Sequence, residues 1–203
     1  MHYDAIANDH GLALDPFKAL VAPRPIAWVS SLSATGEANL APYSYFNAFA
    51  ENPHYLAFGS GRGRHDQRKD SLRNIVETGE FVISIVTLAL KDAMNASSMN
   101  APHGVDEFEA AGLAKAPSIR VKPSRVAASP VAFECKLYKV LDLPDSQGLV
   151  ENHMVIGRVL TIHIDDRYIA DGRVDTAAFH PIGRLGYSEY ATVLEAWKMR
   201  RPD

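Results

Sequence analysis

Two long apolar segments constrain the fold most: "VAFECKLYKVLDL" (131–143) and "HMVIGRVLTIHID" (153–165). Both are rich in β-branched and aromatic residues and contain no proline, so we predict two long strands. Long strands expose unpaired backbone groups along their sides unless neighbouring strands cover them. The rest of the chain must therefore supply partners. A closed or nearly closed antiparallel barrel is the economical way to hide so many edges.

Shorter segments supply the partners. A hairpin is predicted where "IAWVSSLS" is followed by the turn "ATGE" and a returning strand. The predicted shorter strands are 26–33, the segment returning after 34–37, 54–60, and 80–87.

A change of period predicts a helix over 70–79, with Asp70 or Ser71 capping its start and Gly79 its end. Residues 88–98 and 105–113 also favour helix, the latter with Asp106 near its start. Strands dominate and helices are few, so the fold class is mainly β with inserted helices.

Composition sets the remaining bounds. A chain of 203 residues and 22.2 kDa suits a single domain spanning 1–203. A net charge of −3 argues against nucleic-acid binding. The first residues lack the pattern of a secretory signal, and the apolar run at 81–90 is too short to span a bilayer, so we expect a cytoplasmic protein without a membrane segment.

Cysteine and histidine patterns give no metal site. Cys135 is the single cysteine, which excludes an internal disulfide, and its place on an apolar strand face predicts a buried thiol. The histidines show no metal-binding spacing. His163 and Asp165, two residues apart on one strand, are expected to form a surface ion pair rather than a ligand pair.

The glycine-rich stretch "GSGRGR" (59–64) matches neither a dinucleotide fingerprint nor a P-loop. It does begin a basic segment, Arg62, Arg64, Arg68 and Lys69, that leads into the predicted helix at 70. A helix N-terminus favours phosphate, and Ser71 adds a hydroxyl. Spacing alone leaves two alternatives open: a phosphate site, or a solvated basic loop with an ordinary serine cap.

The stretch "APYSYFNAF" (41–49) mixes rings with Pro42, Ser44 and Asn47. On a single strand neither face would be purely apolar, so a half-buried strand does not explain it. The hydroxyl and amide groups either satisfy each other within a core or are aimed at a ligand.

Four segments together are similar to the flavin reductase-like, FMN-binding split-barrel family, which includes flavoredoxin and the reductase components of two-component monooxygenases. The resemblance covers roughly residues 16–190. The segments are 23–53, 69–86, 152–165 and 181–190.

The resemblance implies a split β-barrel that binds FMN and uses NADH or NADPH. It places His153 and Tyr187 beside the reacting face of the flavin, with the Tyr187 ring narrowing the opening. It also implies a cofactor-binding set that includes strand residues, the phosphate segment and the tail. These are Ser30, Ser31, Ser44, Tyr45, Phe46, Asn47, Ala48, Arg62, Lys69, Asp70, Ser71, Arg184, Gly186 and Tyr190.

The function that the resemblance implies is an NAD(P)H-dependent flavin oxidoreductase that passes reducing equivalents to a monooxygenase or another acceptor. A homodimer is expected, because a split barrel leaves part of the flavin cleft for a partner subunit to complete. Three alternatives remain: a flavoredoxin-like electron carrier, a flavin-storage or sensing module, and a barrel without a cofactor.

Overall fold

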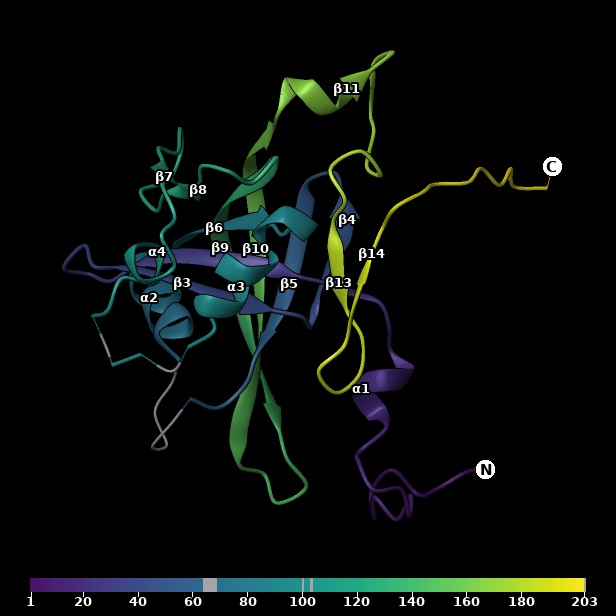
Figure 1. Cartoon of the computed structure of the whole chain (residues 1–203). Helices are drawn as coiled ribbons and strands as arrows, with labels where there is room; N and C mark the ends of the chain where they lie inside the picture. The colour runs from purple at the N-terminus through teal and green to yellow at the C-terminus, as the bar shows by residue number, and fades with distance from the viewer. Residues whose placement is uncertain (64–68, 100, 103, 203) are drawn as a thin grey trace.

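A computed structural model describes residues 1–63, 69–99, 101–102 and 104–202 (Figure 1). Its main sheet has seven strands in the order β3-β2-β6-β9-β10-β5-β4, with antiparallel neighbours throughout. These strands are β2 (Ala27–Leu32), β3 (Ala38–Tyr43), β4 (Phe46–Glu51), β5 (His54–Ser60), β6 (Glu80–Ile85), β9 (Val131–Pro144) and β10 (Val150–Ile164).

Short strands and helices make up the rest of the fold. A small three-stranded sheet joins β1 (Arg24–Pro25), β13 (Ile182–Arg184) and β14 (Tyr190–Thr192). Two-stranded pairs join β7 (Lys115–Ala116) to β8 (Arg125–Val126) and β11 (Ile169–Ala170) to β12 (Arg173–Val174). The helices are α1 (Phe17–Leu20), α2 (Asp70–Thr78), α3 (Lys91–Ala96) and α4 (Glu107–Ala110), with single 3₁₀ turns η2 (Leu88–Leu90) and η3 (Asp166–Tyr168).

The main sheet curls on itself and stays split. The ring of Tyr43 on the edge strand β3 lies 4.8 Å, centre to centre, from the ring of Phe58 on β5, the neighbour of the other edge strand β4. In the described residues, however, no ladder joins the edge strands β3 and β4. This is the mainly β, split-barrel fold class that the resemblance implies, and the prediction is confirmed.

Strand β2 shows why two hydrophobic clusters form. Both of its faces are buried, and its side chains alternate between them. Ala27 and Val29 point into the barrel cluster, which also takes Leu72 and Ile75 of α2. Trp28 points the other way into a second cluster beneath α3 and α4, where its Nε1 donates to Ser97 Oγ at 2.8 Å.

Helix α2 fulfils part of its prediction. Gly79 ends it in the left-handed region (φ 74°) and donates its N–H to Ile75 O, as expected for a glycine C-cap. The predicted N-cap is wrong: Lys69 occupies that position and provides no side-chain cap, while Asp70 and Ser71 lie inside the first turn. Asp106 does cap α4, accepting from Phe108 N at 3.0 Å.

The predicted His163–Asp165 surface pair is wrong. His163 Nε2 instead lies 2.6 Å from Oε1 of fully buried Glu134 on β9, because antiparallel pairing sets the two strands side by side. Asp165 pairs with Arg167 in the following turn. Cys135 is a free, fully buried thiol, as predicted, and burial raises its pKa. In the described part of the chain, no helix is long and apolar enough to cross a membrane.

Candidate functional site: two cavities beside the barrel split

The stretch 41–49 does not form one strand. β3 ends at Tyr43, the chain bends at Ser44 and Tyr45, and β4 begins at Phe46. Because β3 and β4 are opposite edges of the main sheet, this bend crosses the split. Tyr45 O accepts the N–H of Gly59 at 2.7 Å, and a Cβ at Gly59 would come within 3.0 Å of Tyr45 Cβ. The mixture of rings and polar groups thus belongs to a crossing point between two edges.

A groove of about 920 Å³ runs along this bend. Phe46 and Phe58 supply rings to its walls from β4 and β5, and the segment around α1 borders it. Ser44, Asn47 and His153 add polar side chains. Apolar walls with a few polar groups, in a volume within the usual range for ligand sites, can hold a flat organic molecule.

Lys69 gives the groove a cation. Its Nζ lies 5.2 Å from the centre of the Tyr43 ring, and its partial burial lowers its pKa. Within the described residues, no carboxylate pairs with it. A lysine ammonium in this setting is suited to a phosphate or another anion.

Two buried hydroxyls near Lys69 have no hydrogen-bond partner within the part of the chain that the structure describes. Tyr43 is buried, and burial raises its pKa to about 12, although the nearby hydroxyls of Ser71 and Ser60 offset part of the rise. Tyr43 OH and Ser60 Oγ are buried, yet neither meets hydrogen-bond geometry with any described residue. Ser60 also lines the groove. Unpaired buried polar groups are rare, so this pair marks a place that a ligand could complete.

His153 lies on β10, lines the groove and is held in place by a residue of the neighbouring strand β9. It is 6% exposed, and its Nδ1 lies 2.9 Å from Oδ1 of Asp142, its register partner on β9. Among the described residues this is the only hydrogen bond recorded for the ring, so Nε2 remains for a ligand.

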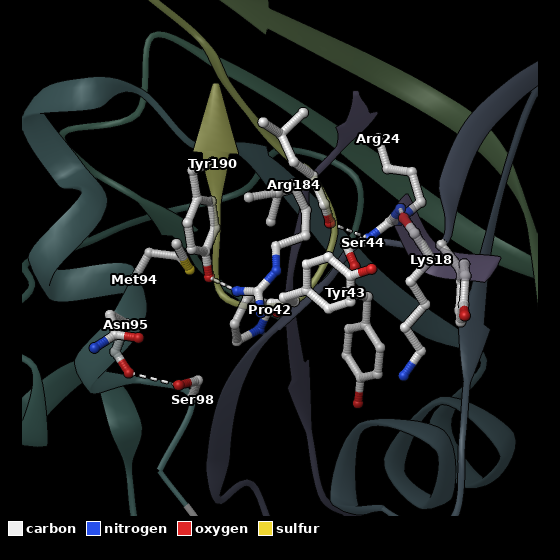
Figure 2. Close-up of a pocket in the computed structure, with 14 residues that line it drawn as sticks. Lys18, Arg24, Pro42, Tyr43, Ser44, Met94, Asn95, Ser98, Arg184 and Tyr190 are labelled. Atoms are coloured by element: carbon white, nitrogen blue, oxygen red, sulfur yellow. Dashed lines mark hydrogen bonds between the residues drawn. The ribbon is translucent and has the colours of Figure 1, made fainter. Parts of the chain in front are cut away.

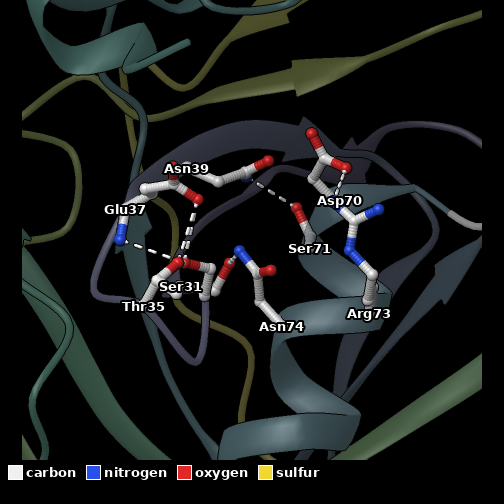
Figure 3. Close-up of polar contacts among 9 residues, drawn as sticks. Ser31, Thr35, Glu37, Asn39, Asp70, Ser71, Arg73 and Asn74 are labelled. Atoms are coloured by element: carbon white, nitrogen blue, oxygen red, sulfur yellow. Dashed lines mark hydrogen bonds and ion pairs between the residues drawn. The ribbon is translucent and has the colours of Figure 1, made fainter. Parts of the chain in front are cut away.

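The predicted phosphate segment is largely engaged within the protein (Figure 3). Ser71 Oγ accepts from Asn39 Nδ2 at 2.9 Å, and Asp70 pairs with Arg73. Among the described residues of this segment, only Lys69 lines the groove. Arg62 pairs with Glu151 outside it. Arg64 and Arg68 lie outside the described residues.

Ser30 and Ser31 are not brought to either cavity. Both are buried on β2, where alternation sends them to opposite faces. Ser30 Oγ donates to Ser124 O at 2.5 Å, and Ser31 Oγ accepts from Asn74 Nδ2 at 3.2 Å (Figure 3). Ala48 is exposed on β4 and donates its N–H to Asn47 Oδ1 at 2.8 Å.

A second cavity, of about 320 Å³, adjoins the groove and shares Ser44 and Tyr45 with it (Figure 2). It gathers Arg184, Tyr187 and Tyr190 from the small sheet and its connecting turn. The Arg184 guanidinium donates to Tyr190 OH and Tyr187 O and lies 4.5 Å from the centre of the Tyr190 ring.

Gly186 precedes Tyr187 and serves packing rather than the cavity lining. A Cβ at this position would come within 2.4 Å of Ala19 Cβ, so only glycine lets α1 lie against the turn. Tyr187 itself adopts the left-handed region (φ 53°) and is 48% exposed.

Arg24 is a site residue that sequence reasoning missed, as are Lys18, Tyr43 and Ser60. Arg24 lines both cavities although it is only 6% exposed. Its guanidinium donates to Lys18 O, to Val21 O at 2.6 Å and to Leu185 O at 2.8 Å, and lies 5.7 Å from the centre of the Tyr45 ring. The sequence feature that could have pointed to Arg24 is its position between two prolines, directly ahead of a buried strand.

Comparison with known proteins decides the family. A family model described as the flavin reductase like domain matches residues 20–178. The chain belongs to this flavin reductase-like family. A protein of Halalkalibacterium halodurans described as uncharacterized is 36% identical over 182 residues, covering 90% of this chain and 87% of the relative.

Two solved structures share both fold and sequence. Nitrilotriacetate monooxygenase component B from Bacillus cereus superposes with a TM-score of 0.87 at 31% identity, covering 98% of this chain and 100% of the other. Pseudomonas fluorescens 2-nitrobenzoate 2-nitroreductase gives 0.85 at 30% identity, covering 100% and 96%. These findings confirm the resemblance and support flavin-dependent oxidoreductase chemistry.

Proposed function

We propose that this flavin reductase-like protein binds FMN in the larger groove, accepts reducing equivalents from NADH or NADPH, and passes them to a monooxygenase or another acceptor. The observation that carries the proposal is the groove at the barrel split. It combines aromatic walls, the polar groups of the bend, and Lys69 beside two buried hydroxyls, for which the described residues supply neither a carboxylate nor a hydrogen-bond partner.

The residues present fit such a cofactor. Bound FMN would supply the hydride-accepting ring, while the protein binds and orients it. Lys69 would hold the phosphate, and Ser44 would face the polar edge of the ring. Asn47 Oδ1 already accepts from Ala48 N–H, so its NH₂ is left to donate to the ring. His153, fixed by Asp142, would present Nε2 to the cofactor or to the nicotinamide.

The names of similar proteins support an acceptor beyond the flavin. One is component B of a monooxygenase and another reduces a nitro group. A flavoredoxin-like electron carrier is the second candidate, and Tyr187 favours it. Its ring stands in the cavity beside the bend, where it could take the place of a nicotinamide.

A partner subunit and a cellular location also belong to this proposal. We infer a homodimer in which β4 lies at the interface, since this edge strand is exposed from Asn47 to Glu51 and carries Phe49 at 63% exposure. The requirement for reduced nicotinamide makes the cytoplasm the expected location.

Competitive titration with FMN and riboflavin tests the phosphate assignment, because riboflavin lacks the phosphate. FMN should bind at least about tenfold more tightly, and Lys69→Met should remove most of that preference. The matched control is Lys139→Met, which removes an exposed β9 lysine outside both cavities. Equal affinities of the wild-type protein for FMN and riboflavin would overturn the assignment.

Asn47→Leu tests the ring contact. Loss of the amide should cost about 1–3 kcal/mol of FMN binding and leave the fold intact. Anaerobic mixing with NADH or NADPH then separates reductase from carrier. Rapid bleaching of the flavin absorbance supports the reductase, whereas slow bleaching with both nucleotides, but fast reduction by dithionite, favours the carrier.

A further inference from the structure

The smaller cavity, which Ser44 and Tyr45 help to line, is rich in positive charge. Lys18, Arg24 and Arg184 line it, and none of its 14 described lining residues is Asp or Glu (Figure 2). Throughout the described residues, no carboxylate pairs with Lys18 or Arg184. Three cations around one cavity repel one another, and a bound anion would offset that repulsion. The charge therefore points to an anionic ligand.

The cavity is also built to hold that charge in place. Arg24 is almost fully buried, and its Nε has no hydrogen-bond partner among the described residues. Arg184 is fixed by two hydrogen bonds and by the Tyr190 ring beneath it. A guanidinium held in this way loses little freedom on binding, and its planar fork suits a carboxylate.

The remaining walls select a small, flat molecule. Ile26, Met94 and Pro42 provide apolar surface, and Tyr187 and Tyr190 add aromatic rings. A volume of about 320 Å³ is at the small end of ligand sites and is too small for a dinucleotide. Aromatic and thioether side chains favour a ring as the ligand body.

We propose that this cavity binds the carboxylate of a small aromatic acid, with Arg184 and Lys18 as its cationic partners. As a statement about substrate class, this rests on the proposed function: the acid would lie beside the flavin groove, because both cavities share six lining residues, Lys18 and Arg24 among them. Binding of the acid itself does not require flavin, so the two proposals can fail separately.

The test uses benzoate and benzamide, which have nearly the same shape and differ in charge. Ligand-observed NMR titration is performed with the full chain, with and without FMN. Benzoate should bind at least about tenfold more tightly than benzamide, and raising the salt concentration should weaken benzoate alone. Arg184→Gln and Lys18→Met should each reduce the benzoate preference severalfold, whereas the control Lys139→Met should retain it. Circular dichroism checks that each variant is folded.

Three results would overturn the proposal. Equal binding of benzoate and benzamide would exclude a carboxylate site, and would suit a neutral amide instead. An unchanged benzoate preference in both cavity variants would place benzoate elsewhere. Loss of the FMN-over-riboflavin preference in Arg184→Gln, together with competition between benzoate and FMN, would make the cavity the phosphate site. Retained benzoate binding with no FMN binding would refute the proposed function and leave the carboxylate site standing.

Discussion

Arg24→Met should destabilise two parts of the site at once, the segment around α1 and the turn that contains Tyr187. The arginine donates to carbonyls of Lys18 and Val21 beside α1 and of Leu185 before the Tyr187 turn. Hydrogen bonds from a charged donor contribute about 1.5–3 kcal/mol each. The gross loss is partly offset, because Val21 is exposed and water can solvate its freed carbonyl, and because a buried charge with an unpaired Nε is removed. We expect a net cost of about 3 kcal/mol.

Urea unfolding measures that cost, and hydrogen exchange locates it. Exchange should accelerate over 17–21 and 185–190 and stay unchanged in β9 and β10. FMN affinity should fall about tenfold, since the Tyr45 ring loses the cation against it. The matched control is Arg125→Met, because Arg125 Nε donates to a single carbonyl, Pro117 O at 3.1 Å, away from both cavities. Equal unfolding free energies for the two variants, with unchanged exchange at 17–21 and 185–190, would refute the reasoning.

Three further predictions concern packing, pH and assembly. Gly186→Ala should lower the free energy of unfolding by about 1–3 kcal/mol, because its Cβ meets Ala19, and adding Ala19→Gly should restore much of the loss in thermal unfolding. Burial raises the pKa of Glu134, but hydrogen bonds from His163 and two backbone N–H groups outweigh it and leave the pKa lowered. The resulting stability should be complete above about pH 4.3, the usual glutamate pKa, and lost as pH falls through the folded-state value, so acid titration of Glu134→Gln should be flatter than that of the wild-type protein. Phe49→Glu should turn the expected dimer into a monomer in sedimentation; a monomeric wild-type protein would contradict the assigned interface.

Local pattern was enough to predict much of the fold. The long strands β9 and β10 follow from β-branched runs, and α2 from Leu72 and Ile75 at helical spacing. Gly79 ends that helix because a left-handed residue is needed there, a requirement that acts within one turn. In each case the cause lies within a few residues of its effect.

Long-range features escaped the same reasoning. Nothing local to 41–49 shows that β3 and β4 lie at opposite edges of the main sheet, so the sequence indicated that a single half-buried strand does not explain this stretch but could not locate the bend at Ser44. Serines at 30 and 31 look alike in sequence, yet alternation sends one toward Ser124 and the other toward α2. Arg24 depends on carbonyls as distant in sequence as Leu185. Such partners are set by tertiary packing, which no short window contains.

The bend itself joins the two proposed sites. Ser44 and Tyr45 belong to the walls of both cavities, and Tyr45 contacts both the Gly59 N–H and the Arg24 cation. A ligand in the larger groove and one in the smaller cavity would therefore contact the same two residues. Because edges that are not hydrogen-bonded to each other flank this bend, it can shift at less cost than a strand within a ladder. Any shift made by one ligand changes the binding of the other by the same factor, since coupling between sites is reciprocal. Benzoate affinity measured with and without FMN reports that coupling directly.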